Sequence, residues 1–282
     1  MLIFNKQSYI IEHLTPFWAS KTRIGFVPTM GALHAGHLSL LAKSLENNAL
    51  TVISIFVNPT QFNNPDDLAK YPRTIERDIE QIESLSKNII VFAPSVEDIY
   101  AQQIVSETFL YDGLENQMEG KHRPGHFDGV GTIVKRLLEI VKPTNAYFGE
   151  KDFQQLQIVK KLVQKNNIPV QIIGCPIHRE ANGLALSSRN ERLSPTERSE
   201  AALIFKTLKE AKERFGTKSA IKVTAFVENV FKNHATMRLE YFEIADENTL
   251  KTCTRKSKNK QYRAFIAIFV NNIRLIDTIS LN

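Results

Sequence analysis

The stretch RIGFVPTMGALHAGHLSLLAKSLEN, residues 23–47, runs from a short β-rich segment through small residues into an amphipathic pattern. We predict a strand over residues 23–29 and a helix over 37–47. Between them lies PTMGALHAGH, residues 28–37, whose glycines and alanines let a ligand lie against the backbone. A strand that leads into a helix in this way is typical of a parallel α/β sheet.

The same alternation continues along the chain. Residues 51–57 form an apolar run typical of a strand buried on both faces. We further predict helices over 74–86, 129–141 and 151–166, and strands over 88–93, 145–148 and 169–174. The pattern predicts an α/β fold in which residues 1–177 form a Rossmann-like domain with a parallel sheet.

The pattern changes after Cys175 and Pro176. The segment SPTE at 194–197 has the form of a helix start, with an N-cap serine, a proline at the first position and a capping-box glutamate. We predict one long helix from there to about residue 215, a second over 219–233, and strands over 238–245, 263–270 and 273–276. Residues 178–282 are therefore expected to form a smaller α+β lid domain.

Composition excludes several classes of protein. Cys175 and Cys253 lie far apart and form no CxxC pair, so no disulfide framework or thiolate zinc site is readable, which suits the cytoplasm. The N-terminus meets Lys6 and Glu12 too early for a secretory signal, and the apolar runs are too short for a membrane helix. We expect a cytoplasmic protein without a membrane partner.

The net charge is mild, at 36 − 30 = +6. It fits either a nucleic-acid partner or anionic small molecules. A basic run over 251–263 is the one candidate for an RNA-binding surface, and a solvated turn between two strands explains it better. We therefore expect small anionic substrates and no nucleic acid.

Two histidines carry the strongest chemical signal. His34 and His37 are three apart at the predicted start of a helix, where free N–H groups and the helix dipole favour anions. The chain has no GxxxxGK[ST], GxSxG or HExxH motif. A metal-site fragment or a structural pair would explain the histidines alone, but their place in a strand–glycine–helix transition favours nucleotide phosphates.

Three later segments fit the same chemistry. Lys151 and Gln155 follow a predicted strand, where α/β folds bind ligands, although Lys151 alone could be a solvated lysine. The segment LSSRN, residues 186–190, offers two hydroxyls and a guanidinium, or else an ordinary polar linker. Asn58 and Gln61 in FVNPTQF suit a hydroxylated substrate with one carboxylate.

Together these segments resemble a known family. PTMGALHAGH, SIFVNPTQF, YPRT, RPGHFDGVGTIV, FGEKDFQQL and LALSSRN are similar in order and spacing to the pantothenate synthetases, or pantoate–β-alanine ligases, of the HxGH nucleotidyltransferase superfamily. The resemblance covers residues 23–192. It implies a homodimeric enzyme that uses ATP and Mg²⁺ to join (R)-pantoate to β-alanine through pantoyl adenylate, releasing pyrophosphate and AMP.

The resemblance also implies roles for individual residues. His37 occupies the place of a proton donor, and we expect His34, His37, Lys151 and Arg189 to stabilise phosphate charge during catalysis. Gln61 and Gln155 are implied ligands of the substrates, Asn58 supports them, and metal ligands stay unassigned. The implied ATP-binding residues are Met30, Gly31, Ala32, Leu33, His34, Ala35, Gly36, His37, Gly149, Glu150, Lys151, Asp152, His178, Leu186, Ser187, Ser188 and Arg189.

Some positions depart from the family pattern or match it only weakly. His178 stands where a smaller apolar residue is common, and Leu186 replaces a frequent methionine. Tyr71, Arg73 and Arg123 match positions near the pocket or at a subunit contact. A different HxGH nucleotidyltransferase is the competing enzyme, but that class lacks the NPTQF and EKDFQQL segments.

Overall fold

The larger sheet has six parallel strands in the order β1-β4-β3-β2-β5-β6. The computed structural model describes residues 1–101 and 103–282. The strands are β1 (Leu2–Phe4), β2 (Ile24–Thr29), β3 (Leu50–Ile55), β4 (Ile89–Phe92), β5 (Asn145–Gly149) and β6 (Gln171–Cys175). The predicted α/β class and the parallel sheet are confirmed, and the short edge strand β1 was not predicted.

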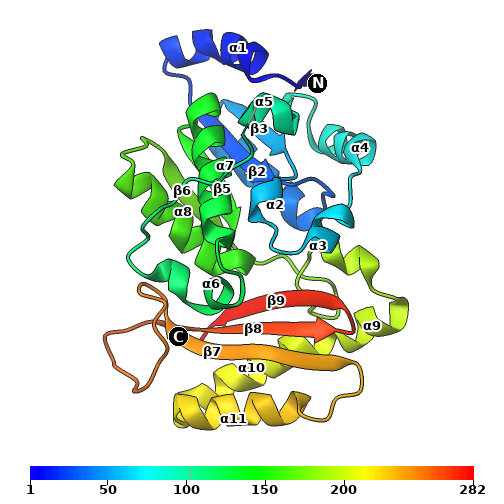
Figure 1. Cartoon of the computed structure of the whole chain (residues 1–282), viewed down its shortest axis with the longest axis vertical. Coiled ribbons are helices and arrows are strands. Elements are labelled where there is room, and N and C mark those ends of the chain that lie inside the picture. Colours follow the sequence, from blue (N-terminus) through cyan, green and yellow to red (C-terminus); the bar gives the residue numbers. More distant parts are fainter. Residues whose placement is uncertain (102) are drawn as a thin grey trace.

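Helices cover both faces of this sheet (Figure 1). The longer ones are α1 (Gln7–Ala19), α2 (Ala35–Asn47), α4 (Ile75–Leu85), α7 (His126–Val141) and α8 (Phe153–Lys165). Short helices and 3₁₀ turns connect them: η1 (Pro59–Gln61), α3 (Pro65–Ala69), α5 (Val96–Tyr100), η2 (Leu114–Asn116), α6 (Met118–His122) and η3 (Glu150–Asp152). The sequence predictions missed α1 and the short helices.

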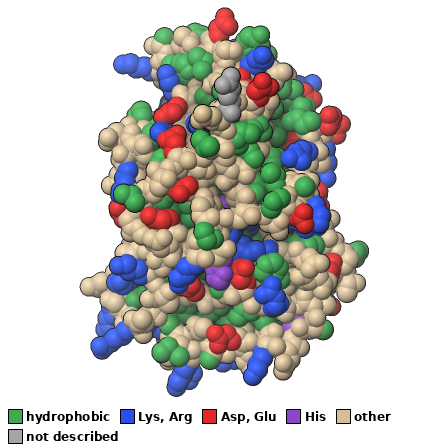
Figure 2. Space-filling view, in the orientation of Figure 1, with side chains coloured by type: hydrophobic (Ala, Val, Ile, Leu, Met, Phe, Trp, Pro, Cys, Tyr) green, Lys and Arg blue, Asp and Glu red, His purple; other side chains and the backbone are tan. Residues whose placement is uncertain are grey.

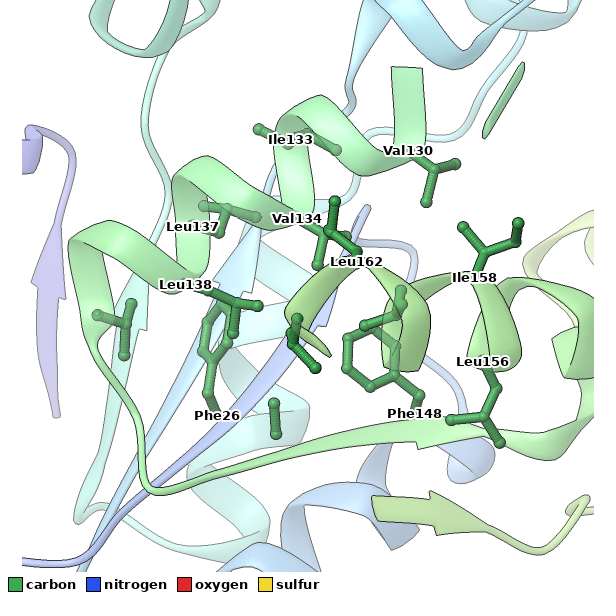
Figure 3. Packing of buried hydrophobic residues seen from close by; sticks show 14 of the residues in the cluster. Phe26, Val130, Ile133, Val134, Leu137, Leu138, Phe148, Leu156, Ile158 and Leu162 are labelled. Carbon is green, nitrogen blue, oxygen red and sulfur yellow. The ribbon is translucent and has the colours of Figure 1, made fainter. Parts of the chain in front are cut away.

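Alternate residues of the strands face opposite helices. Phe26 of β2 belongs to the core under α7 and α8, whereas its neighbour Val27 packs with Leu41 of α2 and Ile82 of α4. Figure 3 shows the first of these cores, in which α7 and α8 direct apolar side chains onto Phe26 and Phe148. Burial on both faces explains why these strands appear in the sequence as continuous apolar runs.

The last third of the chain forms a second, antiparallel sheet in the order β7-β8-β9. Its elements are η4 (Ser188–Arg192), α9 (Pro195–Glu200), α10 (Ala202–Thr217), α11 (Ala220–Phe231), β7 (Met237–Asp246), β8 (Tyr262–Val270) and β9 (Ile273–Ser280). The capping box of Ser194 and Glu197 is confirmed. The single long helix predicted from it was wrong, because the chain breaks into α9 and α10 at Ala201.

The second sheet lies against the end of the first part of the molecule, below α6 and α8 in Figure 1, and α10 and α11 lie on its far side. Leu250 and Phe265 belong to the larger hydrophobic core, and Arg263 lies over the Phe153 ring. The basic run 251–263 is the mostly exposed connection between β7 and β8, as predicted. Within the described residues, no helix is both long and apolar enough to cross a membrane.

Candidate active site

A cavity of about 230 Å³ opens at the carboxyl ends of β2, β3 and β5 and is closed by the segment 176–189. Figure 2 shows basic, acidic and histidine side chains gathered where the two parts of the molecule meet. Most predicted site residues line the cavity: Met30, His34, Gly36, His37, Asn58, Gln61, Gly149, Lys151, Asp152, Gln155, His178, Leu186, Ser187, Ser188 and Arg189. The sequence segments are thus brought together at one place.

The other predicted residues, Gly31, Ala32, Leu33, Ala35 and Glu150, lie outside the cavity lining in the part of the chain that the structure describes. Glu150 instead approaches Arg263 of β8, at 3.5 Å. Its carboxylate therefore helps to hold the two sheets together.

The histidine pair has a different geometry from the predicted helical pair. His34 is the N-cap of α2 and has extended backbone angles, whereas His37 lies in the first turn. The Nδ1 atom of His34 accepts a hydrogen bond from the Gly36 N–H at 3.2 Å, and the His34 N–H donates to Nδ1 of His37 at 3.4 Å. The two rings stack with their centroids 4.0 Å apart. The imidazoles therefore cap the helix and fix each other's orientation.

These contacts determine which ring nitrogens face a ligand. Burial, assisted by the charge of Lys151, lowers the pKa of His34 to about 4. Burial and the neighbouring His34 hold the pKa of His37 well below its usual range. Both rings are therefore neutral near pH 7, and because each Nδ1 accepts a hydrogen bond, the ring proton is on Nε2. The pair offers two N–H donors to an anionic oxygen.

The loop between β2 and α2 is held from behind by Asp78 of α4. Its carboxylate accepts hydrogen bonds from the backbone N–H groups of Ala32, at 2.9 Å, and Leu33, at 2.8 Å. These bonds turn the two N–H groups away from the cavity. Asp78 was not predicted from the sequence. It lies four positions before Ile82, on the apolar face of the helix, and an acid at such a position indicates a buried carboxylate that needs a hydrogen-bond partner.

The two cations of the site each meet a carboxylate. Lys151 Nζ lies 3.1 Å from Asp152, and an Arg189 nitrogen lies 2.7 Å from Asp67, which Arg192 also approaches at 3.4 Å. Burial is the largest single influence and acts to raise the pKa of Asp67, but the hydrogen bond from Arg189 and the charges of Arg189 and Arg192 together outweigh it, so the pKa is lowered. The site thus holds fixed positive charge that internal carboxylates balance.

An amide group lies beside the apolar wall formed by α7. Asn58 is 1% exposed, and its Nδ2 donates to the Gly129 carbonyl at 3.0 Å and to Gln61 Oε1 at 3.1 Å. Its Oδ1 accepts from the Tyr100 hydroxyl at 2.6 Å. All three side chains line the cavity. Because its polar atoms are occupied in this way, Asn58 orients Gln61 and leaves Gln61 and Gln155 to contact a ligand.

The motif RPGHFDGVGTIV, residues 123–134, holds the backbone of Gln61. No definite role for Arg123 in this motif was predicted from the sequence. The Gln61 carbonyl oxygen lies 2.8 Å from Nδ1 of His126 and accepts a bond from Arg123 at 3.3 Å. Nε2 of His126 lies 3.2 Å from the Arg123 guanidinium, which can only donate, so the His126 proton is on Nδ1. Arg123 therefore supports the pocket by holding the Gln61 backbone, and His126, which was not predicted as a site residue, contacts the same carbonyl oxygen.

The whole chain matches one family. The family model described as pantoate-beta-alanine ligase matches residues 3–280. The chain belongs to this family. It is 66% identical over 281 residues to a pantothenate synthetase of Flavobacterium psychrophilum and 53% identical over 282 residues to that of Christiangramia forsetii, with full coverage of all chains.

Solved structures of pantoate–β-alanine ligases have the same architecture. Pantothenate synthetase from Thermus thermophilus is 35% identical with a TM-score of 0.91, covering 100% of this chain and 99% of its own. Pantoate-β-alanine ligase from Francisella tularensis, solved in complex with β-γ ATP and β-alanine, is 36% identical with a TM-score of 0.82, covering 100% and 98%. The family resemblance inferred from the motifs is confirmed.

Proposed function

We propose that this chain condenses (R)-pantoate with β-alanine at the expense of ATP, giving pantothenate, AMP and pyrophosphate. The observation that carries the proposal is the joint lining of one cavity by two neutral Nε2–H donors, two fixed cations and a pair of glutamine amides. The donors and cations suit a polyphosphate, and the amides suit a small hydroxylated acid.

In the first step, a carboxylate oxygen of pantoate attacks the α-phosphorus of ATP, and the bond to pyrophosphate breaks. Negative charge grows on the phosphate oxygens as this bond breaks. The Nε2–H groups of His34 and His37 donate to those oxygens, and Lys151 and Arg189 neutralise the leaving pyrophosphate. Arg189 exchanges its Asp67 partner for phosphate.

In the second step, the amine of β-alanine attacks the acyl carbon of pantoyl adenylate. A C–N bond forms, AMP leaves with the electrons of the C–O bond, and the proton of the amine passes to the departing phosphate. Gln61 and Gln155 orient the pantoyl group, while Asn58 holds Gln61 in place. Both steps use bound substrates, so the residues contribute positioning and charge stabilisation.

Mg²⁺ accompanies the triphosphate in this proposal. Over residues 1–101 and 103–282, no cluster of three or more His, Cys, Asp or Glu side chains is arranged to hold a metal ion. Mg²⁺ commonly takes one or two protein carboxylates and completes its shell with phosphate oxygens and water. Asp152, which lines the cavity, fits that requirement. The bound ion would neutralise part of the triphosphate charge.

We also propose that residues 178–282 act as a lid over the domain formed by residues 1–177. The last third of the chain has a hydrophobic core of its own, and Ser187, Ser188 and Arg189 reach the cavity from the connecting segment. Solution scattering tests the proposal. Compaction on addition of ATP and pantoate is expected, and an unchanged radius of gyration would contradict a closing lid.

A cytoplasmic homodimer completes the proposal. Ile104, Val105 and Leu110 expose 54%, 56% and 75% of their surfaces, which supports a subunit contact along this segment. The free, buried Cys175 and Cys253 suit a reducing compartment. Light scattering coupled to gel filtration gives the mass directly, and a monomer at micromolar concentration would contradict the dimer.

The decisive experiment is the exchange of labelled pyrophosphate into ATP in the presence of pantoate and the absence of β-alanine. The proposed adenylation predicts exchange that depends on pantoate. Exchange with pantetheine phosphate or nicotinamide mononucleotide instead of pantoate would identify a different nucleotidyltransferase and overturn the proposal.

A further inference from the structure

Asp78 is a buried acid that lies close to the site without reaching the cavity. It is 1% exposed and comes from α4, more than 40 positions after the loop that it contacts. We propose that Asp78 is a positioning residue that holds the loop 30–34 in its nucleotide-binding conformation. This inference rests on the proposed use of ATP.

The loop adopts a backbone conformation that its sequence does not favour by itself. Gly31 and Ala32 have φ angles of +79° and +49°, both in the left-handed region. Glycine enters this region readily, but alanine does so at a cost in free energy. Consecutive left-handed residues therefore need an external contact to stay in place.

The Asp78 carboxylate supplies that contact. Its two oxygens each accept one N–H, from Ala32 at 2.9 Å and from Leu33 at 2.8 Å. A hydrogen bond to a buried carboxylate is stronger than one between neutral groups. A Cβ atom on Gly31 would lie 3.0 Å from Asp78 Oδ2, so the carboxylate lies directly against the turn. The turn is thus shaped around this side chain.

Both sides of the loop are secured. The hydroxyl of Ser188 donates to the Ala32 carbonyl at 2.9 Å, opposite the bond from the Ala32 N–H to Asp78. Thr74 Oγ1 in turn donates to Asp78 Oδ1 at 3.2 Å, which orients the carboxylate. The loop ends at His34, so its conformation determines where the first imidazole lies.

Asp78→Asn tests this role with almost no change in side-chain size. The amide keeps one acceptor oxygen but turns an NH₂ group toward the second backbone N–H, where donor meets donor. Exposed Glu80 on the same helix provides the matched control, Glu80→Gln, which removes the same charge. The dissociation constants of ATP and of pantoate are measured by calorimetry, together with pyrophosphate exchange.

A positioning role predicts that Asp78→Asn raises the ATP dissociation constant about tenfold or more, because a hydrogen bond to a charged group is lost. The dissociation constant of pantoate stays within twofold, and Glu80→Gln behaves like the wild type. A merely structural role would instead lower the active fraction and leave both dissociation constants unchanged, and that result would overturn the proposal.

Thr74→Val serves as a second, milder variant in case Asp78→Asn does not fold. It removes the hydroxyl that orients the carboxylate and should weaken ATP binding severalfold in the same selective manner. Unchanged ATP affinity in Thr74→Val and in any folded Asp78→Asn would refute the inference. A wild-type protein without pantoate-dependent exchange would instead contradict the proposed function, so the two failures are distinguishable.

Discussion

Replacing His34 by asparagine should reduce the loss of stability that acid causes in this protein. Asparagine is a strong N-cap residue, and its Oδ1 can accept the Gly36 N–H in place of the imidazole. The start of α2 keeps its cap, whereas the variant loses the ionisable ring and its stacking on His37. The comparison therefore reports the titration of His34 together with its effect on the pKa of the stacked His37.

The size of the effect follows from the lowered pKa. Burial, followed by the charge of Lys151, brings the pKa of His34 from 6.5 to about 4. As the pH falls, the unfolded chain binds the proton first, so stability is lost between pH 6.5 and about 4 and the loss is complete below that range. At about pH 5, these two pKa values correspond to a loss of about 2 kcal/mol.

Urea unfolding followed by circular dichroism, at about pH 8 and about pH 5, measures this loss. The free energy of unfolding of the wild type should fall by about 2 kcal/mol more than that of His34→Asn. At about pH 8, His34 is neutral in both the folded and the unfolded chain, so the difference between the two proteins there reports the changed cap and the lost ring stacking. His126, whose pKa burial also lowers to about 4, is present in both proteins and cancels. Equal losses in the two proteins would refute the assignment of His34 as a buried neutral imidazole.

Three further substitutions test the site and its support. Lys151→Ala should lower pantoate-dependent pyrophosphate exchange about a hundredfold and the reaction of supplied pantoyl adenylate much less, and equal losses would indicate general positioning. Gly129→Ala places a Cβ atom 2.4 Å from a carbonyl oxygen of η1, so stability should fall by about 2 kcal/mol and the KM for pantoate should rise. Gly216→Ala is the control, because a Cβ atom at Gly216 meets open space. An unchanged KM for pantoate in Gly129→Ala would show that η1 does not contribute to pantoate binding. The guanidinium of Arg179 donates to the two carboxylate oxygens of Asp277 at 2.7 and 3.0 Å, and Asp277 is only 4% exposed. Arg179→Gln leaves this buried carboxylate without its cation, so the free energy of unfolding measured by thermal unfolding should fall by about 3 kcal/mol. Asp277→Asn in the same background should restore part of that loss, and no recovery would show that the buried charge is not the cause.

The sheet could be predicted because its signals are local. Strands β3 and β4 are apolar runs bounded by turns, and the capping box at 194–197 marks a helix start within four residues. Helix α1 escaped prediction because it contains Pro16 and buries only Ile10 and Leu14, so its apolar stripe is weak. The break at Ala201 also has no local signal, since the residues around it favour a continuous helix.

The site was predictable where its residues occur in contiguous motifs. Residues that act through distant partners were not. Asp78 bonds to a loop 46 positions away, and His126 bonds to a carbonyl 65 positions away. A sequence shows that such residues are polar, but it does not show which backbone group each one holds. The stacked, helix-capping arrangement of His34 and His37 likewise depends on backbone angles that their spacing does not determine.

The hydrogen bond from Ser188 to Ala32 joins residues 156 positions apart. Contacts of such sequence separation form late when a chain folds, because a long loop must close first. The cavity is complete only after the final third of the polypeptide has docked, so a nascent or partly refolded chain would lack a finished nucleotide site. A ligand that binds only the docked form would shift the population toward it by mass action. Recovery of ATP binding would therefore report the last stage of refolding, after circular dichroism has already recovered.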